Sequence, residues 1–187
     1  MTAMSVAQRM TADEFLAMTF DDGRPRQLIE REVVLTEPRL PHQRVVVRLL
    51  FLLEEWVRAA PGRGEAILPL DIRIDDRNVY APDLLWYAGG HPPYRGEERS
   101  SPLPDLAAEV RSPSTWRYDI GAKKAGYERR GLPELWLVDT AADEVLVFRR
   151  SARDAPTFDV SLELTRADAL TSPLLPGFEL PLSSLFS

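Results

Sequence analysis

Two acidic residues and the arginine that follows one of them have the spacing of a phosphodiester-cleaving site. Asp83 follows Pro82 at the start of a short apolar strand, and Glu109 lies inside a later strand, LAAEV, with Arg111 two residues on and on the same face. A carboxylate in so apolar a strand is costly unless it is paired or ligated. If the two strands are neighbours, both carboxylates converge on one divalent cation, which can activate water and stabilise the phosphoryl group under attack.

A helix expected from about Arg117 to Arg130 supplies further polar side chains. Asp119, Lys123 and Tyr127 are spaced i, i+4 and i+8, so they line one face of that helix. Lys123 reaches the carboxylates if this face meets the end of the sheet. Lys123 and Lys124 are the only lysines among 23 basic residues, which points to a need for an ammonium group there.

The same residues also allow a purely structural interpretation. Asp83 then caps a loop, Glu109 forms a buried salt bridge, for example with Lys123, and Asp119 pairs with Lys123 on the helix surface. An acid followed by an acid and a cation is a weak pattern, so spacing alone leaves both interpretations open.

The amino-acid composition limits which kinds of metal site the protein can form. The chain has 187 residues, the usual size of one domain, with 44% hydrophobic and 28% charged residues, as in a soluble globular protein. It contains no cysteine and only His42 and His91, which excludes disulfides, thiolate zinc sites and multi-histidine metal sites. A metal would have to bind mainly to carboxylates, which favours the hard ions Mg²⁺ or Mn²⁺.

The net charge of −6 argues against a protein that coats nucleic acid non-specifically. The segment from 95 to 130 nevertheless has eight cationic and six acidic residues, so it carries +2 around the proposed site. That distribution favours a phosphate substrate. Neither a signal peptide nor a membrane span is recognisable, so we expect a cytoplasmic protein without membrane partners.

The alternation of helix and strand patterns predicts an α/β fold with a mixed sheet. A Thr11–Glu14 capping box opens a short helix, a hairpin over 26–36 turns near residues 30–31, and a long helix runs from His42 to Ala60. Further strands are expected over 65–74, 83–87, 105–111, 135–138, 144–149 and 158–165. No glycine-rich phosphate loop follows any of them, so a Rossmann or P-loop protein lacks its fingerprint.

The long helix is apolar on nearly all sides. Leu49, Leu53 and Trp56 form one stripe, and Val46, Leu50 and Val57 form a second. Such a helix must be covered on both flanks, so we expect the sheet on one and another subunit on the other. This predicts a homodimer through helix 42–60 or a neighbouring surface.

The run DLAAEVRSPST at 105–115, followed by Asp119, Lys123, Tyr127 and the segment GLPELWLVD at 131–139, resembles the Uma2 family of restriction endonucleases in the PD-(D/E)XK nuclease superfamily. Pro82-Asp83 is similar to the family's upstream PD, and residues 26–32 to its YELIDGE segment. His42 matches the histidine at the start of the long helix, and LPGFEL near the end is similar to the C-terminal motif.

The resemblance implies a single restriction-endonuclease-like domain over residues 1–187, with a mixed β-sheet flanked by helices and usually dimeric. An N-terminal helix and hairpin would occupy 11–36 and a C-terminal extension 156–187. It implies a DNA endonuclease that hydrolyses phosphodiester bonds with Mg²⁺ or Mn²⁺. Asp83 and Glu109 would be catalytic metal ligands, and Lys123 would be the catalytic lysine, because Arg111 stands where the superfamily has its own.

Several other residues would support such a site: His42, Arg111, Asp119 and Tyr127. Gln27 stands where the family has a glutamate, and Glu32 is the expected substitute if that acid is needed. These departures leave an alternative, a catalytically degenerate nuclease-fold dimer that acts as a binding or interaction module. A small-molecule hydrolase on the same scaffold is a third hypothesis, since metal-bound water also attacks other esters.

Overall fold

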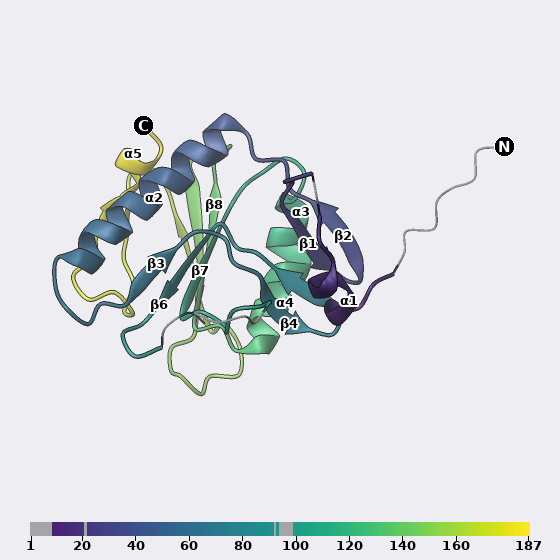
Figure 1. Cartoon of the computed structure of the whole chain (residues 1–187). Helices are drawn as coiled ribbons and strands as arrows, with labels where there is room; N and C mark the ends of the chain where they lie inside the picture. Colours follow the sequence, from purple (N-terminus) through teal and green to yellow (C-terminus); the bar gives the residue numbers. More distant parts are fainter. Residues whose placement is uncertain (1–8, 21, 92, 94–98) are drawn as a thin grey trace.

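The computed structural model describes residues 9–20, 22–91, 93 and 99–187 (Figure 1). Arg95, Glu97 and Glu98, which contribute to the charge of the predicted basic segment, lie outside these residues. Helix α1 (Ala12–Ala17) begins at the predicted capping box, where Thr11 Oγ1 accepts a hydrogen bond from the Glu14 amide and the Glu14 carboxylate accepts one from the Thr11 amide.

The predicted hairpin consists of β1 (Arg26–Ile29) and β2 (Glu32–Leu35). Its turn is at Glu30 and Arg31, whose φ angles are 51° and 70°. Two consecutive positive φ angles match the right-handed twist of the flanking strands, which is why a two-residue loop adopts them. The turn therefore forms where it was predicted, although neither residue favours that conformation.

A six-stranded sheet with the order β10-β9-β8-β7-β6-β3 forms the centre of the fold. Only β7 and β8 run parallel, and the other neighbours are antiparallel, so the sheet is mixed as predicted. The strands are β3 (Glu65–Ile67), β6 (Leu84–Tyr87), β7 (Leu106–Val110), β8 (Glu134–Asp139), β9 (Glu144–Arg149) and β10 (Val160–Leu164).

A smaller antiparallel sheet with the order β2-β1-β5-β4 adds β4 (Ile72–Asp75) and β5 (Asn78–Tyr80). The prediction of one strand over 65–74 was wrong, because the chain leaves the large sheet after Ile67 and enters the small one at Ile72. Pro69 lies in the gap and has no amide hydrogen to donate to a ladder. The three-residue strand β5 was not predicted.

Helices cover both faces of the large sheet (Figure 1). Helix α2 (Leu40–Arg58) packs on one face, where Leu49 and Leu53 are fully buried. Burial of each such side chain contributes about 1.5–3 kcal/mol. On the other face lie α3 (Trp116–Tyr118), the π-helical turn η1 (Asp119–Lys123) and α4 (Lys124–Arg130), with Tyr127 buried against the sheet.

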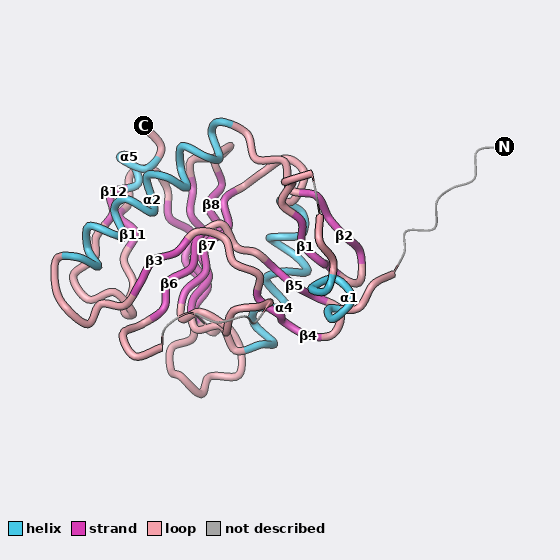
Figure 2. The backbone as a smooth tube through the Cα atoms, viewed as in Figure 1, coloured by secondary structure: helices cyan, strands magenta, loops and turns pink. Residues whose placement is uncertain are grey.

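The C-terminal segment folds back along α2 (Figures 1 and 2). It contains β11 (Ala169–Leu170), β12 (Leu180–Pro181) and α5 (Leu182–Leu185). The Arg48 guanidinium donates a hydrogen bond to the Leu185 carbonyl at 3.0 Å, and Trp56 Nε1 donates one to the Pro176 carbonyl at 3.1 Å. The C-terminal segment thus contacts α2. The residues of the second stripe, Val46, Leu50 and Val57, belong to the core of their own chain or pack against it, so they do not require another subunit.

No helix in the described part of the chain combines the length and the hydropathy needed to cross a membrane.

Candidate functional site

Asp83 and Glu109 lie at the same end of two neighbouring strands. The register of β6 and β7 pairs Leu84 with Ala108, and Asp83 and Glu109 are the next residues beyond that pair. The charge of Asp83 contributes to the raised pKa of Glu109, so the two carboxyl groups lie close enough to interact. Asp83 Oδ2 also accepts a hydrogen bond from the Val110 amide at 2.7 Å, which holds its carboxylate against β7.

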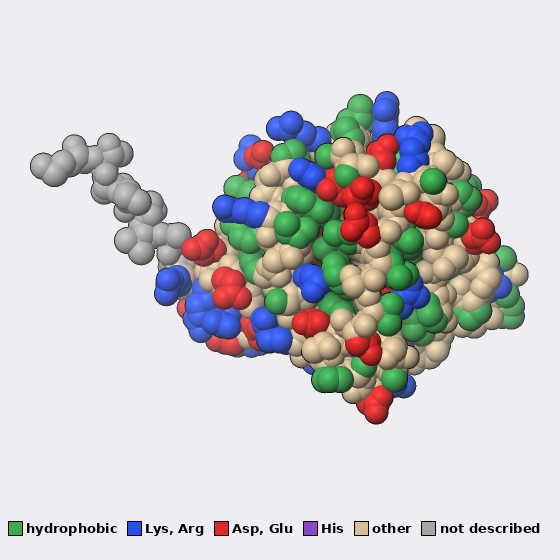
Figure 3. Space-filling view, turned by 180° about the vertical axis from the view of Figure 1, so that it is seen from behind, with side chains coloured by type: hydrophobic (Ala, Val, Ile, Leu, Met, Phe, Trp, Pro, Cys, Tyr) green, Lys and Arg blue, Asp and Glu red, His purple; other side chains and the backbone are tan. Residues whose placement is uncertain are grey.

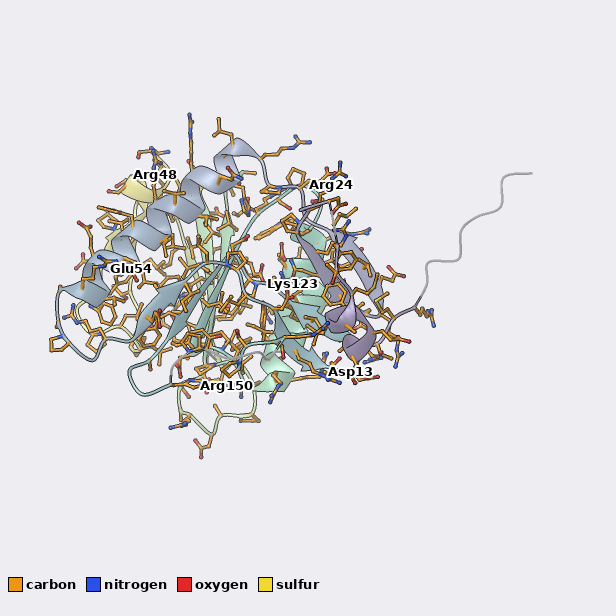
Figure 4. All side chains as sticks on the ribbon, viewed as in Figure 1. Asp13, Arg24, Arg48, Glu54, Lys123 and Arg150 are labelled. Atoms are coloured by element: carbon orange, nitrogen blue, oxygen red, sulfur yellow. The ribbon has the colours of Figure 1, made fainter. Side chains whose placement is uncertain are left out.

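The helical segment brings its polar face to the same place. Lys123 Nζ lies 2.6 Å from Glu109 Oε1 and 3.0 Å from Asp119 Oδ1, and the Tyr127 hydroxyl donates a hydrogen bond to Glu109 Oε1 at 2.7 Å. In Figure 4 the Lys123 side chain lies between this segment and the large sheet. Asp119, Lys123 and Tyr127 therefore share one face, as their spacing predicted.

The helix that carries these residues is not the continuous α-helix predicted over 117–130. A π-helical turn at Asp119–Lys123 separates α3 from α4. Its i→i+5 hydrogen bonds make room for one extra residue per turn, and such turns occur often at functional sites. Thr115, just before this segment, donates a hydrogen bond from Oγ1 to Asp119 Oδ2 at 3.2 Å and so steadies the carboxylate that contacts Lys123.

These charged groups are deeply buried. The exposed fractions are 2% for Glu109, 1% for Asp119 and 0% for Lys123. The expectation of a surface ion pair between Asp119 and Lys123 is therefore wrong, whereas the buried ion pair between Glu109 and Lys123 is present.

The cluster holds more negative charge than its one lysine balances. Burial, together with the neighbouring acids Asp119 and Asp83, raises the pKa of Glu109 to about 8, although Lys123 lowers it. Burial also raises the pKa of Asp119. Burial alone would lower the pKa of Lys123, but the Asp119 and Glu109 carboxylates outweigh it and raise that pKa above its ordinary value. Such a group of acids favours binding of another cation, either a proton or a metal ion.

This electrostatic imbalance predicts a pH-dependent stability. The pKa of Glu109 in the folded protein is about 8. This pKa lies above the ordinary value of about 4.3 in an unfolded chain. At pH values between the two, the folded state therefore binds more protons than the unfolded state. In EDTA, the free energy of unfolding should therefore contain a contribution that declines as pH rises from about 5 to about 8. Urea denaturation across that range, with Glu109→Gln showing a flatter decline than the wild type, checks this. Equal slopes for both proteins would contradict it.

His42 and Gln27 hold Asp83 in place. His42 Nε2 lies 3.1 Å from Asp83 Oδ1. Gln27 is buried in β1, and its Oε1 accepts a hydrogen bond from the Ala81 amide at 3.0 Å. Gln27 thus acts on the backbone that leads into Asp83, a role that its place in the sequence did not indicate.

Glu32 does not belong to this site. It is exposed at the start of β2, beside the hairpin turn. In the small sheet Leu28 pairs with Val79, so Gln27 lies near Ala81 while Glu32 lies at the opposite end of the hairpin. The expectation that Glu32 substitutes for the missing family glutamate is wrong.

Arg111 contacts Asp139 and not Asp83 or Glu109. Its Nη1 donates hydrogen bonds to both carboxylate oxygens of Asp139, at 2.9 and 2.7 Å. Sequence reasoning missed Asp139. The parallel pairing of Val110 with Val138 places Arg111 opposite it, so knowledge of that strand pair would have found the contact.

Much of the positive charge predicted around the site is already paired. Lys123 and Arg111 contact carboxylates as described, and Arg129 Nη2 lies 3.8 Å from Asp75 Oδ2. On the face seen in Figure 3, basic and acidic side chains are interspersed. Three cations of this segment are therefore paired with carboxylates, of which only those of Lys123 are fully buried.

The donor groups fit a hard divalent ion held by two carboxylates. Mg²⁺ commonly takes one or two protein carboxylates and completes its shell with water and substrate oxygens. Lys123 and Tyr127 both contact Oε1 of Glu109, so Oε2 is the oxygen that neither engages. A cage of protein ligands alone does not fit, because within the described ranges no group of three or more His, Asp or Glu side chains is arranged to hold a metal.

The fold has a solved counterpart. A crystal structure titled as that of "a putative nuclease belonging to DUF820" from Anabaena variabilis is similar, with a TM-score of 0.77 and 18% sequence identity over 95% of this chain and 97% of that chain. At this identity the likeness shows the fold alone. No curated protein matches the sequence. The family Uma2, described as "Putative restriction endonuclease", matches residues 12–183. Because this match takes in nearly the whole sequence, the chain belongs to the Uma2 family.

Proposed function

We propose that this protein is a metal-dependent DNA endonuclease in which Asp83 and Glu109 hold Mg²⁺ or Mn²⁺. The observation that supports the proposal is that Asp83, just before β6, and Glu109, in β7, lie at one end of these paired strands, with the buried Lys123 ammonium 2.6 Å from Glu109. An ion bound there would supply Lewis acidity and a water molecule of lowered pKa. Membership of the Uma2 family supports the same reaction class.

The protein's own residues provide positioning and charge. Lys123 presents an ammonium group next to Glu109, where it can neutralise a phosphate oxygen or orient the attacking water. Asp119 holds Lys123 from the other side at 3.0 Å, and Tyr127 fixes the Glu109 carboxylate through its hydroxyl. His42 keeps the Asp83 carboxylate in place from α2. Asp119, Tyr127 and His42 are thus positioning residues.

Plasmid nicking tests the proposal. Wild-type protein should convert supercoiled DNA to open-circle or linear forms with Mg²⁺ or Mn²⁺ and should be inactive in EDTA. Hydrolysis of bis(p-nitrophenyl) phosphate in parallel separates a general phosphodiesterase from an enzyme that requires DNA. Failure to cleave any of these substrates with either ion would contradict the proposal.

The second candidate is a catalytically degenerate, dimeric binding module. Arg111 stands where the superfamily has lysine, and it pairs with Asp139 and not with the acids of the site. Calorimetric titration with Mg²⁺ discriminates between the two functions. Ion binding that Glu109→Gln removes supports the nuclease, and absence of ion binding favours the module.

Dimerisation would occur through the outer face of α2, between two copies of this chain. Leu40, Val47 and Phe51 on this face are 61%, 63% and 61% exposed. With Arg44 and Glu54 they form one stripe at spacings of three and four residues, which we call the α2 stripe. If two copies pack antiparallel about a dyad between Val47 and Phe51, Val47 meets the partner's Phe51 and Arg44 meets the partner's Glu54. A twofold interface needs this self-complementarity.

Light scattering at micromolar concentration tests the dimer. Wild-type protein should have twice the mass of the chain, and Phe51→Glu should be a monomer because it buries a charge in the apolar part of the stripe. Leu162→Glu is the matched control, since Leu162 is also exposed but lies in β10. A monomeric wild type, or a Phe51→Glu variant that stays dimeric, would contradict this interface.

A further inference from the structure

A chain of three hydroxyl groups leads to the Asp119 carboxylate from the loop that follows β7. Thr115 Oγ1 donates a hydrogen bond to Asp119 Oδ2 at 3.2 Å. Ser112 Oγ lies 2.7 Å from Thr115 Oγ1 and 3.2 Å from Ser114 Oγ. Ser112 and Thr115 are only 1% and 4% exposed, whereas Ser114 is exposed. Serine and threonine are mostly found at protein surfaces, so two buried hydroxyl groups that lead to one buried acid indicate a specific role.

The carboxylate fixes the direction of the hydrogen bonds in this chain. An ionised carboxylate only accepts hydrogen bonds, and each hydroxyl has a single proton to donate. Thr115 donates its proton to Asp119, so Ser112 has to donate to Thr115. Ser112 Oγ in turn accepts from the Ser114 hydroxyl and from the Thr115 amide, at 3.2 and 3.3 Å. The three O–H groups therefore all point along the chain toward Asp119, and hydrogen bonds aligned in this way strengthen one another.

The Thr115 hydroxyl is not used to cap the helix that follows it. A threonine just before a helix commonly accepts a hydrogen bond from an amide two or three residues on. Thr115 directly precedes α3, but its side chain makes no such bond. The first amides of this segment donate to backbone groups, that of Trp116 to the Ser112 carbonyl and that of Asp119 to the Thr115 carbonyl. The hydroxyl is thus directed to the charged cluster.

Asp119 transmits this support to Lys123. Its Oδ2 accepts the hydrogen bond from Thr115, and its Oδ1 lies 3.0 Å from the Lys123 ammonium. The torsion at the end of an aspartate side chain has a broad range, so a donor at Oδ2 limits how far Oδ1 can turn away from the lysine. Burial raises the pKa of Asp119, and the Lys123 ammonium and the Thr115 hydroxyl both act against burial. The hydroxyl chain therefore favours a charged carboxylate that faces the lysine.

We propose that the hydroxyl chain of Ser112 and Thr115 positions the Lys123 ammonium for catalysis. It acts through the Asp119 carboxylate, so Ser112 and Thr115 are positioning residues and not catalytic residues. The inference rests on the proposed function, because that function gives Lys123 a role in cleavage. A reacting group has to be held within about 0.5 Å of its productive position, and neighbouring hydrogen bonds provide that precision.

The rival explanation is that these hydroxyl groups only stabilise the loop at 112–115. Ser172 offers a matched control, because it is also a buried hydroxyl, 6% exposed, and donates to the buried carboxylate of Glu134 at 2.8 Å. It lies in the C-terminal segment that packs with α2, on the face of the sheet opposite Lys123. Ser172→Ala should therefore lower stability and leave Lys123 unaffected, whereas Thr115→Val should change both.

Exchange of the Lys123 ammonium protons with water tests the positioning in EDTA, without metal, DNA or cleavage. Lys123 and Lys124 are the only lysines, so protein labelled with ¹⁵N-lysine has two side-chain ammonium groups. The NMR signal that remains in Lys124→Met belongs to Lys123. Its protons should exchange slowly in the wild type, because Lys123 is fully buried.

Thr115→Val should speed this exchange by about fivefold, the effect of one lost hydrogen bond, and Ser112→Ala should speed it by about twofold. Thr115→Ser keeps the hydroxyl and should retain the wild-type rate. If Thr115→Val does not fold, Ser112→Ala provides the same comparison. Exchange at the wild-type rate in the variants that lack a hydroxyl, or equal acceleration by Ser172→Ala, would overturn the proposal.

Cleavage kinetics test the same role during catalysis. Thr115→Val should lower kcat by about tenfold, as expected when a reacting group is slightly misplaced, and should leave KM unchanged. Thr115→Ser should restore kcat. A Thr115→Val enzyme with the wild-type kcat would overturn the positioning role while leaving the nuclease intact. If the wild type cleaves no substrate, the proposed function fails, and ammonium exchange still decides whether the hydroxyl chain holds Lys123 in place.

Discussion

Replacing Lys123 by methionine should destabilise the protein by about 3–5 kcal/mol, the cost of removing one partner from a buried ion pair. Lys123 is fully buried and lies within 3.0 Å of both Glu109 and Asp119. Methionine fills a similar volume, but it leaves two carboxyl groups without their cation. The loss should therefore be smaller at pH 5 than at pH 8, because protonation of the acids relieves it. Urea denaturation at both pH values measures the effect.

Lys124→Met is the matched control for this experiment. Lys124 is the next residue and the only other lysine, and its Nζ lies 4.4 Å from the centre of the Phe148 ring. Loss of that cation–π contact should cost about 0.5–1 kcal/mol. If Lys123→Met costs no more than Lys124→Met, the account of a buried charge cluster is wrong.

Replacing Glu109 by glutamine should abolish metal-dependent cleavage, with a loss of roughly a thousandfold or more in kcat. The amide keeps the shape of the side chain but removes the charge that would bind the ion. The fold should survive, because glutamine avoids the buried carboxylate whose pKa burial raises to about 8. Cleavage assays combined with thermal unfolding separate these two effects.

Glu134 offers a matched control on the neighbouring strand β8. It is also a buried glutamate, 1% exposed, but it accepts hydrogen bonds from Trp136 Nε1 and Ser172 Oγ on the other face of the sheet. Glu134→Gln should retain metal-dependent cleavage. Cleavage that persists in Glu109→Gln, or that is lost equally in both variants, would contradict the assigned role of Glu109.

The strands next to Asp83 and around Glu109 could be predicted because apolar runs indicate buried strands. Strands were expected over 83–87 and 105–111, and the structure has β6 and β7 there. The sequence left open whether the two strands are neighbours, and the structure shows that they pair. The i, i+4, i+8 spacing of Asp119, Lys123 and Tyr127 indicated their shared face. That face persists although the helix contains a π turn, because all three side chains still meet around Glu109.

Other features depend on contacts between distant parts of the chain, so local patterns did not reveal them. Gln27 accepts a hydrogen bond from the Ala81 amide, and Arg111 donates hydrogen bonds to Asp139. Each contact depends on which strands are neighbours. The second apolar stripe of α2 suggested another subunit because periodicity does not show that Val46, Leu50 and Val57 pack into the core of their own chain. Glu32 was predicted from its similarity to a family acid, but it lies at the start of β2, at the turn end of the hairpin and away from Gln27.

Manganese soaked into crystals of the protein, with anomalous diffraction to locate it, tests the central claim most directly. The account predicts one peak within bonding distance of both Asp83 and Glu109, on the face of the sheet that Lys123 covers. The same soak of Glu109→Gln should show no peak there. A manganese ion bound elsewhere, or no peak between the two carboxylates of the wild-type protein, would contradict the account.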